Sequence, residues 1–304
     1  MAAFHNELYA RQLYWWHIIG FSGRIKQNQK KMKMFIVSML VTAKTLFSVT
    51  AFAGVPAASM EKPVPKTYVL VHGAWASSAA FEGIKTRLEK AGEKVILVSL
   101  PGHGDDQTPP NTLTMDVYRD KTIEAINSVE GKVILVGHSM GGMVISAVAE
   151  KIPNRIEKLI YLAAFLPANG QSMLDLASTD KDSYLGNALV PSEDKLTIGI
   201  KQDVIVPALC QDAPDGVKQF VVSTFRAEPA IPLTNKVTLT AENFGRVPKY
   251  YIHTLQDHTV SLARQKGMVA AAPNVRKEYS LDSSHTPFLS MPDQLVDLLV
   301  KIGK

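Results

Sequence analysis

The 304-residue chain contains one cysteine, Cys210. This scarcity excludes an intrachain disulfide and a metal cluster built on several thiolates. Internal repeats and low-complexity tracts are also absent, which excludes a repeat architecture. What remains is an ordinary globular composition, with 46% apolar and 20% charged residues. A chain of this length and composition can bury one large core, so we expect a single domain with an inserted segment.

Most of the chain carries no excess of positive charge, although the formal net charge of the whole chain is +5. Residues 1–53 hold seven of the 33 basic residues and only one of the 28 acidic residues, Glu7. Residues 54–304 therefore carry 26 basic and 27 acidic side chains, a net charge of −1. A near-neutral folded part gives no support for nucleic-acid binding.

The N-terminal residues have the pattern of a targeting segment. Basic residues at 30–33 precede a mostly apolar stretch, 35–52, and Ala51-Phe52-Ala53 has the form of a signal cleavage site before Gly54. The apolar run 35–43 is too short to span a bilayer, so no stable membrane partner is expected. We predict an upstream extension (1–31) that translation can bypass, a signal peptide (32–53) and a linker (54–66). The protein is expected to be exported, periplasmic or secreted, and cytoplasmic if the leader does not function.

Strand and helix signals alternate from residue 67 to residue 304. Apolar runs predict strands, and stretches with helical spacing predict helices between them. Alternation of this kind predicts a mostly parallel sheet covered by helices on both faces, with a site at the carboxyl ends of its strands. The predicted strands are 67–71, 94–100, 132–136, 159–164, 249–254 and 275–280, and the predicted helices are 81–90, 116–129, 139–151, 260–271 and 291–302.

The alternation stops between residues 167 and 247. Scattered prolines and short helical pieces fill this stretch, which is too long for an ordinary loop in a compact domain. We expect an inserted cap over the site, with a disordered insertion as the alternative.

A glycine-serine pentapeptide, Gly137-His138-Ser139-Met140-Gly141, lies between a predicted strand and a predicted helix. This order resembles the nucleophile elbow of α/β-hydrolases. A tight turn strains the serine backbone and requires small neighbours, and the free N–H groups of the next helix point at the same place. Ser139 is therefore the candidate nucleophile.

A serine nucleophile needs a base and a group that orients the base. His285 is the candidate base, because it lies in a loop after the last predicted strand and before the last helix. Asp257 follows an earlier strand and gives the order Ser, Asp, His, so it is the candidate orienting acid. Asp282 and Asp175 are its competitors. The other histidines are His5, His17, His72, His103, His138, His253 and His258.

Two backbone N–H groups should stabilise the oxyanion. The residue after the nucleophile, Met140, supplies one, and the turn after the first strand supplies the other, for which Ala74 is the candidate. The neighbouring Gly73 and Trp75, and His138 of the pentapeptide, are candidate substrate contacts. His103 with Asp105 and Asp106 permits a metal interpretation, but solvated loop residues explain this pattern better, so no metal or cofactor is expected.

Taken together, these stretches resemble the α/β-hydrolase superfamily, and more narrowly its plant methyl esterase and hydroxynitrile lyase branch with related bacterial esterases. The resemblance covers residues 66–303 and is carried by 68–75, 132–143, 163–167, 251–265 and 282–287. The lyases have a threonine at the position of Gly73 and a lysine at that of Thr286, and a lysine charge would stabilise departing cyanide. Both departures favour an esterase. Residues 76–79 depart from the plant esterases, which puts substrate identity in doubt.

The sequence therefore predicts a serine carboxylesterase that acts on small or medium esters without a cofactor, as a monomer or homodimer. Its expected partner is a small-molecule ester, with no nucleic acid. The alternatives are a hydroxynitrile lyase, another hydrolase of the same fold such as an amidase or lactonase, and a non-catalytic ligand receptor.

Overall fold

The computed structural model of this protein describes residues 64–304. The predicted upstream extension, the predicted signal peptide and most of the predicted linker lie outside these residues. Within the described part, no helix combines the length and the apolar character that a bilayer crossing requires.

A six-stranded sheet forms the centre of the fold, and every pair of neighbouring strands in it is parallel. The strand order is β2-β1-β3-β4-β8-β9. Parallel strands end at the same edge, so the loops that follow them converge there. The strands are β1 (Thr67–Val71), β2 (Lys94–Val98), β3 (Val133–His138), β4 (Ile156–Leu162), β8 (Lys249–Thr254) and β9 (Val275–Leu281).

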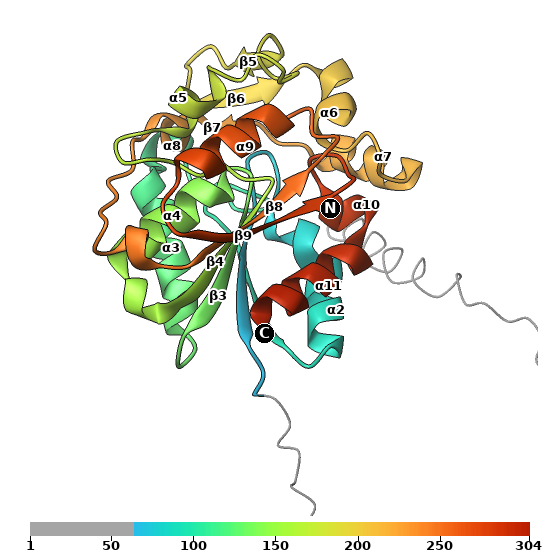
Figure 1. Cartoon of the computed structure of the whole chain (residues 1–304). Coiled ribbons are helices and arrows are strands. Elements are labelled where there is room, and N and C mark those ends of the chain that lie inside the picture. The colour runs from blue at the N-terminus through green and yellow to red at the C-terminus, as the bar shows by residue number, and fades with distance from the viewer. Residues whose placement is uncertain (1–63) are drawn as a thin grey trace, which may run out of the picture. The chain divides into compact units, whose positions relative to one another are not determined.

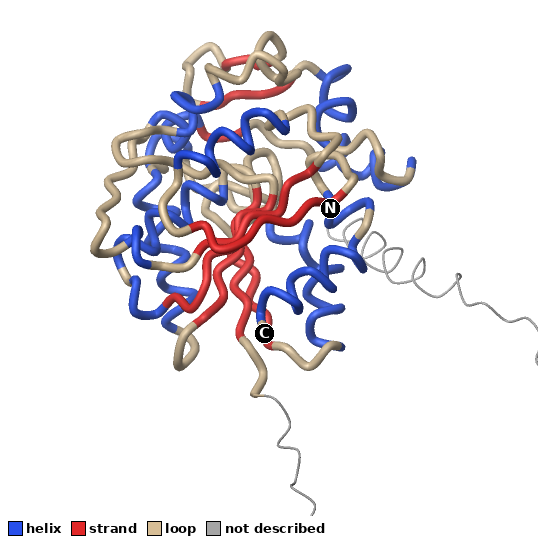
Figure 2. The backbone as a smooth tube through the Cα atoms, viewed as in Figure 1, coloured by secondary structure: helices blue, strands red, loops and turns tan. Residues whose placement is uncertain are grey.

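Helices cover both faces of this sheet, as Figures 1 and 2 show. Side chains alternate between the faces: Leu70 and Val136 pack with α2 and α11, whereas Val69 and Leu135 pack into the core on the other face. Both faces are buried, which explains the continuous apolar runs of the sequence. The main helices are α2 (Glu82–Lys90), α3 (Met115–Asn127), α4 (Gly141–Lys151), α9 (Leu262–Ala271), α10 (Pro287–Ser290) and α11 (Pro292–Gly303).

The predicted α/β fold with its parallel sheet is confirmed, and the boundaries shift by a few residues. The strand predicted over 159–164 runs from Ile156 to Leu162 and ends because Ala163 has a φ of 47°, outside the strand region. The helix predicted from residue 139 begins at Gly141, because Ser139 itself forms the turn before it.

Most of residues 167–247 lie above the edge at which the central strands end, and the last of them run back beside α4 to the start of β8 (Figure 1). Residues 167–247 contain the predicted short helices, α5 (Met173–Ala177), α6 (Gln202–Leu209), α7 (Asp215–Thr224) and α8 (Ala230–Thr234). They also contain an antiparallel sheet that the sequence analysis did not predict, made of β5 (Leu189–Pro191), β6 (Thr197–Ile200) and β7 (Glu228–Pro229). Its strands have two to four residues, too few for a clear alternation of side chains. The role of this insertion as a cap stays a prediction.

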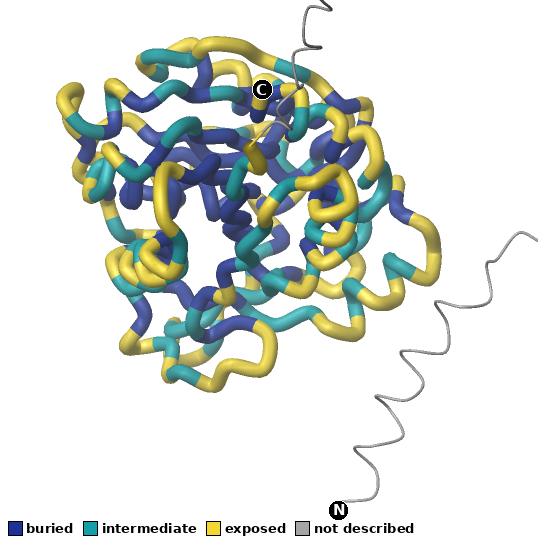
Figure 3. Tube along the Cα trace, turned by 90° about the horizontal axis from the view of Figure 1, so that it is seen from below, coloured by how far each residue is buried: buried dark blue, intermediate teal, exposed yellow. Residues whose placement is uncertain are grey.

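Buried segments run through the middle of the described chain and exposed ones around it (Figure 3). Several polar residues are buried as well, and most of them lie at the carboxyl ends of β1, β3, β8 and β9. This group includes His72, His138, Ser139, Asp257, Ser284 and His285.

Candidate active site

Ser139 lies in the turn between β3 and α4, with a φ of 52° that residues other than glycine rarely adopt. Two glycines let the chain turn this tightly. A Cβ atom on Gly137 would lie 2.6 Å from the carbonyl oxygen of Gly141, and one on Gly142 would lie 2.1 Å from that of Phe165. Both distances are far below van der Waals contact, so the pentapeptide forms the strained turn that the sequence predicts.

His285 and Asp257 lie side by side at the same edge of the sheet. Nδ1 of His285 is 2.8 Å from Oδ2 of Asp257, and both side chains are buried. An ionised carboxylate can only accept, so Nδ1 carries the hydrogen and the other ring nitrogen, Nε2, stays free to accept a proton. Of the three candidate acids, Asp257 is the one that contacts this histidine.

The two competing carboxylates have other partners. Asp282 accepts a hydrogen bond from the side chain of Gln256 at an exposed position. Asp175 caps the start of α5, where it exchanges hydrogen bonds with Ser172. Neither carboxylate is bonded to His285.

The Asp257 carboxylate accepts further hydrogen bonds that fix its orientation. Oδ1 accepts from the backbone N–H groups of Thr259 at 2.8 Å and Val260 at 2.9 Å. Oδ2 accepts from the hydroxyl of Thr254 at 2.7 Å and from the side-chain amide of Gln265 at 3.1 Å. Donors on both oxygens leave the carboxylate little freedom to rotate.

His138 supports the loop that carries His285. Its Nε2 donates to the backbone carbonyl of His285 at 2.9 Å, and its ring packs edge-on against Phe288, with Phe81 farther away. Burial, together with the nearby His285 ring, lowers the pKa of His138 well below its usual value, so the imidazole stays neutral. A contact between His138 and substrate stays a prediction.

The loop of His285 lies beside the turn that carries Ser139, because His138 contacts it. The rings of His138 and His285 lie 4.6 Å apart, and Ser139 directly follows His138. Among the hydrogen bonds of the described residues, none joins the Ser139 hydroxyl to His285. Catalytic hydrogen bonds of this kind are often long without a ligand and shorten when substrate binds.

The two candidate oxyanion donors lie at the start of α4 and in the turn after β1. The N–H groups of Met140 and Ala74 donate to no carbonyl among the turn and loop hydrogen bonds of the described residues. The two turns touch, since a Cβ atom on Gly73 would lie 2.7 Å from the Cβ of Ser139. Trp75, which follows, has a φ of 57° and is almost fully buried. Substrate contacts by Gly73 and Trp75 stay predictions.

The insertion is bonded to the loop of Asp257, where the hydroxyl of Thr259 donates to the carbonyl of Ala208 at 2.8 Å, and to the loop of His285. The hydroxyl of Thr286 donates to the carbonyl of Leu209 at 2.9 Å, and the carboxylate of Asp212 accepts from the N–H of Ser284 at 2.9 Å. These bonds place the end of α6 directly beside the His285 loop. The neighbouring Cys210 is buried, and burial raises the pKa of its thiol to about 11, so it is not an activated nucleophile.

Two of the residues for which the sequence analysis considered and set aside a metal interpretation have ordinary protein partners. His103 pairs with Glu228 at 2.8 Å, and Asp106 accepts from the N–H groups of Gly102 and Thr108. Residues 64–304 contain no group of three or more His, Cys, Asp or Glu side chains placed to hold a metal ion.

Sequence reasoning missed three polar residues of this region, Thr254, Gln265 and Glu228. Gln265 lies eight residues after Asp257 on α9, and Glu228 lies within the irregular insertion. No motif marks these positions. The one available signal was the polar character of Gln265 on a helix that has to cover a sheet.

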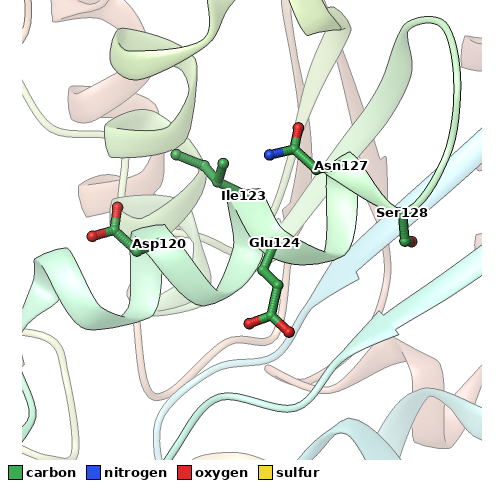
Figure 4. Close-up of a pocket in the computed structure, with 5 residues that line it drawn as sticks. All are labelled: Asp120, Ile123, Glu124, Asn127 and Ser128. Atoms are coloured by element: carbon green, nitrogen blue, oxygen red, sulfur yellow. The ribbon is translucent and has the colours of Figure 1, made fainter.

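A separate surface hollow lies along α3 and is lined by Asp120, Ile123, Glu124, Asn127 and Ser128 (Figure 4). All five residues belong to the second half of this helix or its end, away from the carboxyl ends of the strands. The hollow has no base, nucleophile or buried charge pair, and we assign it no part in the site.

Comparison with known proteins places the chain in a family. The model of the Alpha/beta hydrolase family matches residues 68–298. Putative methylesterase 13, chloroplastic, from Arabidopsis thaliana is 30% identical over 251 residues, which cover 79% of this chain and 56% of that protein. The chain therefore spans little more than half the length of this curated relative.

Solved structures show the same fold. A methylesterase from Arabidopsis superposes with a TM-score of 0.67 and 26% identity, covering 78% of this chain and 98% of the other. Polyneuridine aldehyde esterase superposes with a TM-score of 0.69 and 22% identity, covering 79% and 100%. The match over residues 68–298 and the common architecture lead to one conclusion: this chain belongs to the alpha/beta hydrolase family.

Proposed function

We propose that this protein is a serine hydrolase that cleaves carboxylic esters of small to medium size. Ser139 is the nucleophile, His285 the base, and Asp257 the acid that orients the base. The observation that carries the proposal is the 2.8 Å bond between Asp257 and His285 beside the strained turn of Ser139. A buried acid-histidine pair next to a serine at the edge of the sheet is the arrangement that activates a hydroxyl for acyl transfer.

The first half of the reaction transfers the acyl group to the enzyme. Oγ of Ser139 bonds to the ester carbonyl carbon while Nε2 of His285 takes the hydroxyl proton. The carbonyl oxygen becomes an oxyanion that accepts from the N–H groups of Met140 and Ala74. The bond between carbon and the alcohol oxygen then breaks, and His285 gives its proton to the leaving alcohol.

The second half releases the acid. Water attacks the acyl-enzyme carbonyl while His285 takes one of its protons, and the same two N–H groups bind the second oxyanion. The bond to Oγ breaks, His285 returns the proton to Ser139, and the carboxylic acid leaves. Asp257 stays ionised throughout and stabilises the imidazolium that forms in each half.

Methyl esters are the first substrates to examine, because the plant relatives are named methylesterases. The position after the catalytic histidine also favours ester cleavage over cyanide release. The hydroxyl of Thr286 is used in the bond to Leu209, and no lysine charge is present at that position to stabilise a departing cyanide.

The test is turnover of a panel of p-nitrophenyl and methyl esters of increasing acyl length. Ser139→Ala should abolish hydrolysis of every ester that the unchanged protein cleaves. Ser146→Ala is the matched control, since Ser146 is a buried serine of α4 whose hydroxyl bonds to the carbonyl of Gly142 and to the hydroxyl of Tyr161, and it should retain activity. An active Ser139→Ala protein contradicts the mechanism.

Assays of the same purified protein with other substrates distinguish the remaining candidate activities. Cleavage of mandelonitrile without ester turnover would indicate a lyase, and preference for anilides or lactones would indicate an amidase or a lactonase. A folded protein that turns over none of these compounds and is not modified at Ser139 would be a ligand receptor.

For the N-terminal segment we propose export through the signal pattern at residues 32–53. Basic residues at 30–33, the apolar stretch and Ala51-Phe52-Ala53 support this proposal. The full chain, expressed in a bacterium and recovered from the periplasm or medium, should have Gly54 as its first residue. Recovery of only the uncleaved chain from the cytoplasm contradicts it.

A further inference from the structure

A buried carboxylate from the insertion contacts the turn that carries Ala74. Glu228, in β7, is fully buried, and its Oε2 accepts from the backbone N–H of Trp75 at 2.9 Å. The indole N–H of Trp75 donates to the carbonyl of Ile198, in β6, at 2.8 Å. The small sheet of the insertion therefore holds both the backbone and the side chain of the residue after Ala74.

The backbone of this turn needs such support. Trp75 has a φ of 57°, which is unfavourable for a bulky residue and persists only where the surroundings impose it. The Trp75 N–H belongs to the peptide group between Ala74 and Trp75. Fixing that peptide also limits how far the preceding one, which carries the Ala74 N–H, can rotate.

A second residue holds the other side of the same turn. Nε2 of His72 accepts from the N–H of Leu100 at 3.3 Å, so its Nδ1 carries the hydrogen and donates to the carbonyl of Gly73 at 2.9 Å. Burial and the neighbouring His103 lower the pKa of His72 to about 3. This ring is therefore neutral at any working pH, and its hydrogen-bond pattern does not change.

The charge of Glu228 is balanced by His103. Nε2 of His103 lies 2.8 Å from the same Oε2 that accepts from Trp75. Burial alone would lower the pKa of His103, but the charge and hydrogen bond of Glu228 outweigh it and raise that pKa. The second oxygen of Glu228, Oε1, is buried without a partner among the described residues.

Stability alone does not explain the buried pair of Glu228 and His103. Burying a carboxylate and an imidazolium costs several kcal/mol in desolvation, and a well-packed apolar pair of similar volume is often as stable or more so. A buried carboxylate with only one of its two oxygens hydrogen-bonded adds to that cost. Buried groups with shifted pKa values cluster at functional sites, and this pair contacts the turn of a candidate oxyanion donor.

We propose that Glu228 is a positioning residue that holds the Ala74 N–H in place to bind the oxyanion. This inference rests on the proposed function. It also assigns a task to the insertion: β6 and β7 fix the oxyanion turn. Glu228 does not touch substrate, and it acts through the peptide group of Trp75.

The test compares binding of a tetrahedral mimic with binding of substrate. A trifluoromethyl ketone forms a hemiketal when Oγ of Ser139 bonds to its carbonyl carbon, the proton goes to His285, and the carbonyl oxygen becomes an oxyanion. Its inhibition constant therefore reports on the oxyanion donors, whereas KM for a p-nitrophenyl ester reports mainly on substrate binding. A variant that is merely less folded lowers kcat in proportion to its active fraction but leaves the inhibition constant unchanged.

Glu228→Ala should raise the inhibition constant and lower kcat by a similar factor, about 10-fold to 100-fold, with KM within twofold; loss of one whole oxyanion donor costs about 100-fold to 1,000-fold. Glu228→Gln should recover most of the loss, because its amide oxygen can accept from the Trp75 N–H. Glu278→Ala is the matched control, since Glu278 also bonds a histidine, His253, at 2.8 Å, but on the far strand β9. It should leave both constants unchanged.

An unchanged inhibition constant in Glu228→Ala overturns the proposal, whatever happens to kcat. If that variant does not fold, Glu228→Asp answers the same question, because it keeps the charge but withdraws the carboxylate by about one methylene length. It should raise the inhibition constant, and no change would overturn the proposal. Failure of the unchanged protein to cleave any ester would instead refute the proposed function itself.

Discussion

Nδ1 of His285 and Oδ2 of Asp257 lie 2.8 Å apart although 28 residues separate them in the chain. Their loops follow β9 and β8, which are paired in parallel so that His253 lies beside Ser280 and Thr254 beside Leu281. The register of two neighbouring strands therefore brings the acid to the base. The chemistry of the site depends on how each loop is held once it leaves the sheet.

Thr254 holds the acid, and its hydroxyl can be removed almost without a change of shape. Thr254→Val deletes the 2.7 Å hydrogen bond to Asp257 and leaves the Gln265 amide with one acceptor fewer. We expect kcat for a p-nitrophenyl ester to fall about tenfold, since a lost bond to a charged group is worth about 1.5–3 kcal/mol and part of this reaches the transition state.

Thr122→Val is the control for this substitution. Thr122 is equally buried, but its hydroxyl bonds to the carbonyl of Tyr118 one turn back in α3. It should keep the activity of the unchanged protein. Equal activity in the two variants would show that the hydroxyl of Thr254 has no part in positioning Asp257.

The turn of Ser139 should tolerate no side chain at Gly142. Gly142→Ala puts a Cβ atom 2.1 Å from the carbonyl oxygen of Phe165, which forces the backbone to move. Overpacking of this kind costs about 1–3 kcal/mol or more, so denaturant unfolding should show a loss of at least about 1 kcal/mol.

Gly267→Ala makes the same substitution at an open position. Gly267 lies inside α9, and nothing lies within 4 Å of the position that a Cβ atom would take there. Alanine should stabilise the helix by up to about 1 kcal/mol. Similar stability of the two alanine variants would contradict the close packing of the elbow.

Acid should destabilise the fold through His72 and His138. Burial lowers the pKa of His72 to about 3 and that of His138 well below its usual value. The unfolded chain takes up protons at these residues below about pH 6.5, whereas the folded chain does not, so stability falls with pH in that range. At pH 4.5, two units below the pKa of a free histidine, His72 should account for about 3 kcal/mol, at about 1.4 kcal/mol per pH unit.

His103 adds no loss of its own on acidification. Its pKa is raised in the folded state, so its stabilising effect is complete below about pH 6.5 and is lost as pH rises. The measurement is the free energy of unfolding at pH 7.0 and pH 4.5, with His72→Gln as the comparison. The variant should lose less stability on acidification than the unchanged protein, and an equal loss would contradict the assignment of His72 as neutral.

Much of this architecture could be predicted from the sequence, because apolar runs and helical spacing are local properties. The runs at 67–71 and 249–254 coincide with β1 and β8, and the order of parallel strands then places Ser139, Asp257 and His285 at one edge. The nucleophile elbow was predictable for the same reason. Its tight turn leaves no room for side chains next to Ser139, so glycines appear within a segment of five residues.

The residues that hold the site could not be predicted in this way. Glu228 reaches Trp75 across 153 residues, and Gln265 acts through the packing of α9 on β8. Such contacts leave no period and no motif in the sequence. The short strands β5 and β7 include Pro191 and Pro229, which argue locally against a strand, and only pairing with β6 makes them strands.

The central claim is that the hydroxyl of Ser139 is the nucleophile that His285 activates. Treatment of the folded protein with a fluorophosphonate, followed by intact-mass measurement and peptide mapping, tests it most directly. We predict one adduct per chain, on Ser139, formed much more slowly in His285→Ala and absent in Ser139→Ala. An adduct on another residue, or no adduct on a folded protein that still cleaves esters, would contradict the account.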